Sequence, residues 1–376
     1  MSSPAPNDES TDYTDFTDSR PAVVLRTWDF VIVKHDLRSL TLAELQSEFA
    51  ALGWPRYTAG QIFTWLWQKG IDDLAAMTNL SKERRALLAE RYSLSPPELL
   101  RTLGDEDGTT RFTFKLADGN VIESVYIPDS DRRTVCVSTQ VGCRLGCNFC
   151  YTGTLGFKRN LAWHEIASQV LSVRSFVIRH SNFGITNVVF MGMGEPFLNY
   201  DATIEAAKTI NADNGLGIGA RRITISTSGI PDGIRAFAQL PQQFRLALSL
   251  NASDDETRSR LMPVNKLHPL KEVMAAIRAY TDAKGKRVTF EYVLVDGINN
   301  RDNDAKQLAA LLKGIPCKLN LIPLNPFPGC ELKAPSAESV ETFARKLWPL
   351  VPAVTVRRSK GARILAGCGQ LAGLTE

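Results

Sequence analysis

The stretch Gly142-Cys143-Arg144-Leu145-Gly146-Cys147-Asn148-Phe149-Cys150 places three thiols within eight residues, directly after a predicted strand. Three thiolates can hold three irons of a 4Fe-4S cube and leave the fourth iron open for a ligand, whereas electron-transfer clusters are normally closed by a fourth Cys. A structural zinc site is the alternative, but it needs a fourth ligand, and His164 stands 14 residues beyond Cys150. The stretch therefore favours a catalytic cluster held by Cys143, Cys147 and Cys150.

Strand-like and helix-like stretches alternate six times around and beyond this loop, which predicts an α/β fold. Parallel strands need right-handed crossovers, so six such units predict a partial (β/α)6 barrel over residues 133–350 rather than a closed eight-fold one. In such a fold the chemistry gathers at the carboxyl ends of the strands. The predicted units are Val135–Thr139 with His164–His180, Thr186–Met191 with Ala202–Ala212, Ile223–Thr227 with Gly233–Leu240, Phe244–Leu250 with Leu270–Lys284, Val288–Val295 with Asn303–Lys313, and Leu319–Leu324 with Ala337–Leu350.

Three segments precede the barrel. Residues 1–20 are rich in Ser, Thr, Asp and Pro and predict a disordered acidic tail. Residues 37–95 carry apolar residues at helical spacing, with a capping signal at Ser81, and predict a small helical domain. Residues 96–132 predict a linking β-hairpin, because Arg111–Leu116 and Asn120–Pro128 alternate polar and apolar positions around the turn Ala117-Asp118-Gly119.

The helical domain mixes aromatic and basic residues. Such a mixture can stack on bases and neutralise phosphates, which suits an accessory domain that binds RNA. Core aromatics with solvated charges outside are the alternative, and the sequence leaves both open. The aromatics are Trp54, Tyr57, Trp65 and Trp67, and the basic residues are Arg56, Lys69, Arg84 and Arg85.

The composition of the sequence restricts the partners and the cellular compartment that can be expected. Residues 1–19 hold five acidic and no basic residues, so the net charge of +4 leaves +9 for the rest, a surplus that suits RNA but does not require it. Seven cysteines, an odd number, argue against a secreted disulfide framework. No apolar run reaches the roughly 18 residues of a membrane span, and no signal peptide is visible. We expect a cytoplasmic protein without membrane association.

Glu123 is unusual because it shares a strand face with Val121, Val125 and Ile127. One interpretation is an inward charge that discourages edge pairing. The other is a general base whose pKa burial would raise.

A second polar loop, Gly192-Met193-Gly194-Glu195-Pro196, follows the strand after the cysteine loop. Its glycines let backbone approach a ligand, and Glu195 offers a carboxylate to an amine. It is not a dinucleotide fingerprint, because Pro196 stands where the helix would begin and the third glycine is absent.

Together these motifs resemble the radical S-adenosylmethionine superfamily, and more closely the adenine-methylating RlmN/Cfr family. The resemblance runs from about Leu42 to Leu374. It is carried by Met77-Thr78-Asn79-Leu80-Ser81-Lys82, Val135-Cys136-Val137-Ser138-Thr139-Gln140-Val141-Gly142-Cys143, Met191-Gly192-Met193-Gly194-Glu195-Pro196, Asn325-Pro326-Phe327-Pro328-Gly329 and Ala366-Gly367-Cys368-Gly369-Gln370-Leu371.

The resemblance implies one 4Fe-4S cluster with an open iron and S-adenosylmethionine as cofactors. It also implies that Cys368, in a C-terminal segment over residues 351–376, is methylated, that Cys136 resolves a protein-RNA crosslink, and that Glu123 is the base. Without the family resemblance, Cys136 and Cys368 would be interpreted as small buried hydrophobic residues. Cys317 and Cys330 match no catalytic residue of the family. The implied S-adenosylmethionine contacts are Gly194, Glu195, Ser226, Ser249, Leu250, Asn251 and Asn325.

For activity, the resemblance implies methylation of carbon 2 of adenosine in the peptidyl-transferase region of 23S rRNA, and in tRNA at the adenosine 3′ of the anticodon. Two S-adenosylmethionines would be used, through a methyl-cysteine intermediate and a crosslink to RNA. We expect a monomer that takes electrons from a flavodoxin or ferredoxin system. Methylation of carbon 8, the antibiotic-resistance activity of the other branch, is the close alternative, because both branches share these residues. A non-catalytic RNA-binding iron-sulfur or zinc protein is the alternative from another class.

Three positions depart from the family pattern. Asn251 stands where His is common, and Leu324 stands where Trp is common. Ala362-Arg363 replaces a frequent acidic pair, so we expect a wholly basic approach to Cys368. Its members are Arg357, Arg358, Lys360 and Arg363.

Overall fold

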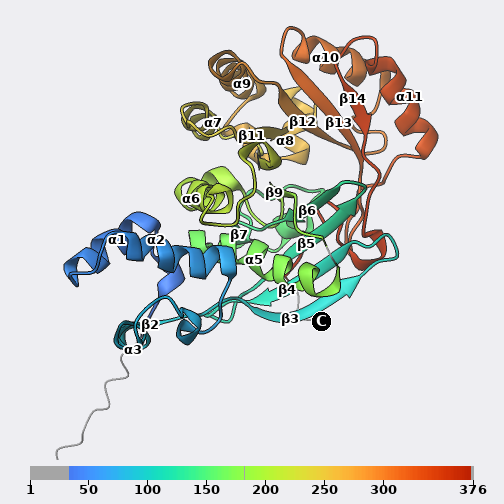
Figure 1. The fold of residues 1–376 in the computed structure, drawn as a ribbon. Coiled ribbons are helices and arrows are strands. Elements are labelled where there is room, and N and C mark those ends of the chain that lie inside the picture. The colour runs from blue at the N-terminus through green and yellow to red at the C-terminus, as the bar shows by residue number, and fades with distance from the viewer. Residues whose placement is uncertain (1–33, 182, 374–376) are drawn as a thin grey trace, which may run out of the picture. The chain divides into compact units, whose positions relative to one another are not determined.

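Ten strands of the described chain form one sheet, in the order β14-β13-β12-β11-β10-β9-β6-β5-β4-β3 (Figure 1). The computed structural model describes residues 34–181 and 183–373, so the predicted tail over residues 1–20 lies outside the described residues. The strands are β3 (Glu98–Gly104), β4 (Thr110–Lys115), β5 (Val121–Asp129), β6 (Arg132–Cys136), β9 (Asn187–Phe190), β10 (Ile223–Thr227), β11 (Arg245–Ser249), β12 (Val288–Leu294), β13 (Cys317–Pro323) and β14 (Val354–Val356).

The seven strands β6 and β9–β14 run parallel. Each of the six predicted strand-helix units is present with its ends shifted by a few residues, so the predicted partial barrel is confirmed; β14 adds a parallel strand that was not predicted. Helices cover the outside of the strands, as parallel crossovers require (Figure 1). They are α5 (Trp163–His180), α6 (Tyr200–Asn211), α7 (Pro231–Ala238), α9 (Leu270–Lys284), α10 (Asp302–Leu312) and α11 (Ala337–Leu347). The short helix α8 (Asp255–Leu261) lies in the connection between β11 and α9.

The predicted hairpin is an antiparallel extension of this sheet. Strands β4 and β5 pair around a turn in which Gly119 has a φ of +81°. Strand β5 also pairs with β6, so it is interior, and edge protection as the reason for Glu123 is wrong. Strand β3 was not predicted, because almost all of its residues are exposed and it shows no buried face.

The N-terminal region of the described chain is helical as predicted, with α1 (Leu42–Ala51), α2 (Tyr57–Thr64), a π-helical turn (Trp65–Lys69) and α3 (Lys82–Arg91). The Ser81 hydroxyl caps α3 by accepting a hydrogen bond from the Arg84 N–H at 3.3 Å. Of the aromatic residues in this helical region, Trp67 fits the core interpretation and Tyr57 fits the RNA-binding interpretation. Trp67 is fully buried and its ring lies 5.4 Å from that of Trp163 in α5, so Trp67 belongs to the core. Tyr57 is 65% exposed and is available to a partner.

None of the helices in the described ranges has the length and apolar character needed to cross a membrane.

Candidate functional site

The cysteine loop is closed at its base by a two-stranded ribbon, β7 (Gln140–Gly142) and β8 (Phe157–Asn160). Gly142 is required there: its φ is +74°, and a Cβ would lie 2.0 Å from the carbonyl oxygen of Gly156. The far side of the loop is docked on α8, because the Asn148 N–H donates to the Leu261 carbonyl at 3.1 Å. The loop is therefore anchored at both ends before any metal binds.

Cys143, Cys147 and Cys150 line a single cavity at the carboxyl ends of the barrel strands. Burial raises the pKa of Cys143 to about 12 and that of Cys147 well above its usual range, and a bound metal would favour their thiolates. Within the described residues, no three His, Cys, Asp or Glu side chains are grouped closely enough for one metal ion. A cube binds each thiolate at a separate iron, so this open set of three thiols fits a 4Fe-4S cluster.

The loop after β9 is shaped around Gly194 and Glu195, both of which line the cavity. Gly194 has a φ of +96°, and a Cβ there would lie 2.5 Å from the Cβ of Gln140. The Glu195 carboxylate accepts hydrogen bonds from the N–H of Phe197 at 3.0 Å, from the N–H of Ser228 at 2.8 Å and from the Ser228 hydroxyl. Burial raises the pKa of Glu195, and these donors oppose that rise. A fixed carboxylate results, which suits recognition of an amine.

The remaining predicted cofactor contacts divide into three groups. Ser226 and Ser249 lie at the ends of β10 and β11 and line the cavity. Asn251 and Asn325 line it too, but their amides are already bonded within the protein: Asn251 accepts from the Val293 N–H at 2.8 Å. Leu250 is fully buried and does not line the cavity, so its role as a contact stays a prediction.

Asn251 adopts a left-handed backbone with a φ of +59°, a conformation that Asn tolerates better than most residues. Its backbone carbonyl accepts a hydrogen bond from the Asn299 side chain at 2.8 Å. The side chain and the backbone carbonyl of Asn251 therefore both hold the loop between β11 and α8.

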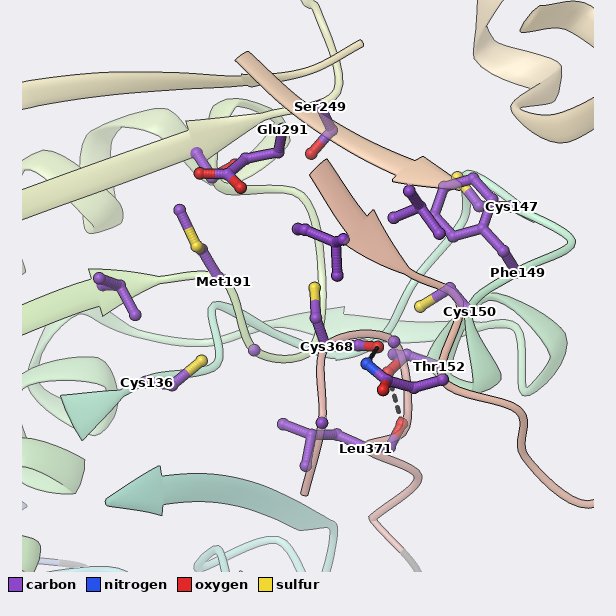
Figure 2. A pocket seen from close by; sticks show the side chains of 18 of the residues that line it. Cys136, Cys147, Phe149, Cys150, Thr152, Met191, Ser249, Glu291, Cys368 and Leu371 are labelled. Carbon is purple, nitrogen blue, oxygen red and sulfur yellow. Dashed lines mark hydrogen bonds between the residues drawn. The ribbon is translucent and has the colours of Figure 1, made fainter. Parts of the chain in front are cut away.

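The C-terminal segment brings Cys368 into the same cavity (Figure 2). The Asn325 amide donates to the Cys368 carbonyl at 3.2 Å, the Tyr151 N–H donates to the Gly369 carbonyl at 2.7 Å, and the Thr152 hydroxyl donates to the Leu371 carbonyl at 2.6 Å. Tyr151 and Thr152 directly follow Cys150, so the segment is fastened to the cysteine loop itself. Cys368 is exposed to solvent within the cavity.

Cys136, the last residue of β6, lines the cavity from the opposite side, and in Figure 2 Cys136 and Cys150 point from two sides toward the segment that carries Cys368. Burial raises the pKa of Cys136 to about 12, a neighbouring Cys368 thiolate adds to the rise, and the Arg357 guanidinium opposes it. A resolving role needs the thiolate, which the Arg357 guanidinium and the Met191 backbone both favour.

Glu123 is 1% exposed and does not line the cavity. One carboxylate oxygen lies 3.6 Å from the Arg111 guanidinium, and the other accepts a hydrogen bond from the Ala372 N–H at 2.8 Å. The carboxylate is therefore bound to the C-terminal segment just beyond Cys368, and its role as a base stays a prediction.

Sequence reasoning missed Glu291, which faces the cavity from the middle of β12. Its Oε1 accepts a hydrogen bond from the Asn320 amide at 3.0 Å, whereas its Oε2 is buried and has no hydrogen-bond partner among residues 34–181 and 183–373. A lone carboxylate in the apolar run Val288–Leu294 was the available signal, and it is the same kind of signal as that of Glu123.

The expected wholly basic approach to Cys368 is wrong for two of its four members. Arg363 forms ion pairs with Asp105 and Glu106, and Lys360 forms one with Asp129. Acidic residues at the β3–β4 turn thus neutralise the arginine that replaces the acidic pair of the family.

Comparison with known proteins agrees with this geometry. Residues 137–309 match the radical SAM superfamily, and residues 35–94 match the ribosomal RNA large subunit methyltransferase N-terminal domain. A probable dual-specificity RNA methyltransferase RlmN of Thermotoga petrophila is 46% identical over 337 residues, which are 89% of this chain and 97% of that protein. The dual-specificity RNA methyltransferase RlmN of Geotalea uraniireducens is 42% identical over 341 residues, 90% of this chain and 97% of that protein.

The crystal structure of a radical SAM methyltransferase from Sphaerobacter thermophilus superposes with a TM-score of 0.86 at 46% identity, covering 90% of this chain and all of that one. Each of these matches covers 89–90% of this chain and at least 97% of the matched protein. The chain therefore belongs to the RlmN family of dual-specificity, radical S-adenosylmethionine RNA methyltransferases.

Proposed function

We propose that this chain methylates carbon 2 of an adenosine in the peptidyl-transferase region of 23S rRNA and of the adenosine 3′ of the anticodon in tRNA. The observation that supports this proposal is a single cavity lined by five thiols. Three belong to the loop of Cys143, Cys147 and Cys150, and the other two are Cys136 and Cys368. The names of the relatives support dual specificity toward RNA, and the description of the N-terminal domain supports RNA of the large ribosomal subunit; tRNA as the second substrate is part of the proposal.

Cys143, Cys147 and Cys150 would hold the cluster, and Glu195 would hold the amine of S-adenosylmethionine, with Ser226, Ser249 and Asn325 beside it. When bound, the cluster and S-adenosylmethionine supply the one-electron chemistry that activates a methyl group. This chemistry is needed because the carbon-hydrogen positions of an adenine ring are not nucleophilic, so displacement from a sulfonium methyl does not suffice.

Cys368 carries the methyl group in this proposal. Its sulfur is exposed to the cavity, while the carbonyls of Cys368, Gly369 and Leu371 are held by hydrogen bonds to Asn325 and to the cysteine loop. The segment thus presents sulfur while its backbone is fixed. Addition of the activated methyl carbon to the adenine ring joins Cys368 covalently to the RNA.

Release requires Cys136. A base removes the ring proton, and the unpaired electron left on the adduct would return to the one-electron centre that supplied it. The Cys136 thiolate then attacks the sulfur of Cys368, a disulfide forms, and the electron pair of the broken carbon-sulfur bond stays with the methylated RNA, which takes up a proton. Glu123 is the candidate base. The flavodoxin or ferredoxin donor and the monomeric state stay predictions.

The test is product analysis with the full chain, reconstituted anaerobically with iron and sulfide. It receives S-adenosylmethionine, reductant and unmodified ribosomal and transfer RNA, and the nucleosides are quantified by mass spectrometry. We expect 2-methyladenosine in both RNAs. Appearance of 8-methyladenosine instead would replace carbon 2 by carbon 8, and a protein that holds metal but consumes no S-adenosylmethionine would be the non-catalytic alternative.

A further inference from the structure

Arg258 is a fully buried arginine of α8, the helix on which the cysteine loop docks. Its Nε donates to the Leu250 carbonyl at 3.1 Å, its Nη1 to the Asn265 amide oxygen at 2.8 Å, and its Nη2 to the carbonyls of Ser228 at 2.5 Å and Ser249 at 3.4 Å. The planar fork of the guanidinium thus joins the loop after β10 to the loop after β11. A lysine has one ammonium and could not reach all these acceptors in the same geometry.

This fork acts on the residues that would bind S-adenosylmethionine. Ser228, whose carbonyl Arg258 holds, donates both its N–H and its hydroxyl to the Glu195 carboxylate. Ser249, whose carbonyl it also contacts, lines the cavity. Arg258 does not line the cavity, so it acts through these neighbours.

The charge of Arg258 has no anionic partner in direct contact within the described residues. All four acceptors of its hydrogen bonds are neutral oxygens. Asp255 attracts it from a distance, but directs its Oδ1 to the Asn265 amide and to the Leu270 N–H. A buried cation without a counterion is costly, so a nearby negative charge would stabilise it.

The cysteine loop would supply that negative charge. It docks directly on α8, where the Asn148 side chain donates to the Arg260 carbonyl at 2.8 Å and its N–H to the Leu261 carbonyl at 3.1 Å. Three thiolates around a cluster carry more negative charge than the empty loop, and a reduced cluster carries one charge more.

We propose that Arg258 is a positioning residue with two effects, both resting on the proposed cluster site. Its buried positive charge stabilises the cluster-loaded cysteine loop and raises the reduction potential of the cluster, because a nearby cation favours the more negative, reduced form. Its fork holds the Ser228 and Ser249 loops in the arrangement that binds S-adenosylmethionine.

The test uses the full chain, reconstituted anaerobically, as wild type, Arg258→Met and Arg258→Lys. Arg260→Met is the matched control, because Arg260 lies on the same helix and is exposed to solvent. Iron content, the cluster midpoint potential from an electron paramagnetic resonance redox titration, and the Kd of S-adenosylmethionine are measured. Circular dichroism and a thermal melt of each apo-protein report folding.

We expect Arg258→Met to shift the midpoint potential of the cluster to more negative values. We also expect it to raise the Kd of S-adenosylmethionine about tenfold or more, as for a lost hydrogen bond that involves a charged group. Arg258→Lys restores the potential toward that of the wild type but not the affinity, and Arg260→Met changes neither. An Arg258→Met protein with a full cluster, an unchanged potential and an unchanged Kd overturns the inference.

If Arg258→Met takes up no cluster, Arg258→Lys decides: recovery of cluster uptake by lysine supports the charge, and failure in a folded lysine variant overturns it. A wild-type protein that takes up no cluster refutes the proposed function instead, so the two failures are distinguishable.

Discussion

The Glu123 carboxylate accepts a hydrogen bond from the backbone N–H of Ala372, four residues beyond Cys368, at 2.8 Å. Arg111, its ion-pair partner, also lies 3.5 Å from the Leu365 carbonyl, three residues before Cys368. The Arg111-Glu123 pair thus contacts the C-terminal segment on both sides of its reactive cysteine. Glu123 can therefore act as an anchor, as a base, or as both.

Glu123→Gln separates these roles. The amide oxygen of Gln can still accept the Ala372 hydrogen bond but cannot take a ring proton. If Glu123 is the base, the variant forms the Cys368-RNA adduct and releases product at least about a hundredfold more slowly, the lower range for loss of a general base. The measurement is single-turnover product release beside adduct on a denaturing gel. Normal release by Glu123→Gln would leave Glu123 with the anchoring role alone.

Replacement of Cys143, Cys147 or Cys150 by Ala should abolish the cluster and all turnover, because each would ligate one iron. Cys317, 3% exposed in β13 and away from the cavity, provides the control, and Cys317→Ala should keep its iron. Iron and sulfide analysis with the visible absorption spectrum measures both. Full iron content in any of the three loop variants contradicts the ligand assignment.

The affinity for S-adenosylmethionine should depend on pH through Glu195. Burial raises the pKa of this carboxylate, and the Ser228 donors oppose the rise. Only the ionised form attracts the cofactor amine, so affinity is present above the pKa and is lost as the pH falls through it. Ser228→Ala removes the hydroxyl donor, so the loss should occur at a higher pH than in the wild type. Titration calorimetry across pH, at constant cluster content, measures this shift; identical profiles would show that Glu195 does not bind the amine.

Trp67 and Tyr57 should behave differently although both are aromatic residues of the same helical region. Trp67→Ala should lower the free energy of unfolding by about 3–5 kcal/mol, because it empties a packed site. Tyr57→Ala should leave the free energy of unfolding nearly unchanged. It should weaken RNA binding by about 1–3 kcal/mol if a base stacks on this exposed ring. Chemical denaturation and RNA titration measure the two effects. Unchanged RNA affinity in Tyr57→Ala would refute stacking at this position.

The barrel could be predicted because its strands are continuous apolar runs separated by amphipathic helices, a pattern that the chain repeats six times. Strand β3 could not, since it buries almost nothing and depends on pairing with β4. The cluster loop could be predicted from local spacing alone. Cys136 and Cys368 come close together in the cavity although they lie more than 200 residues apart in the sequence, and only the family resemblance suggested this proximity.

Arg258 shows a further limit. In the run Asp254-Asp255-Glu256-Thr257-Arg258-Ser259-Arg260 it has the same sequence neighbourhood as Arg260, and both are typical of a solvated helix face. Only packing against the loops after β10 and β11 buries Arg258, while Arg260 stays exposed. Sequence periodicity in a seven-residue helix is too short to make that distinction.

The central claim is that Cys136 releases the RNA adduct from Cys368 in the cavity that the two residues share. Cys136→Ala tests this claim most directly. The variant, loaded with cluster and supplied with S-adenosylmethionine, reductant and RNA, is digested and its Cys368 peptide is analysed by mass spectrometry. We predict a covalent adduct between Cys368 and an adenosine of the RNA that accumulates in place of free methylated product. Normal release of methylated RNA, with no adduct on Cys368, would contradict the account.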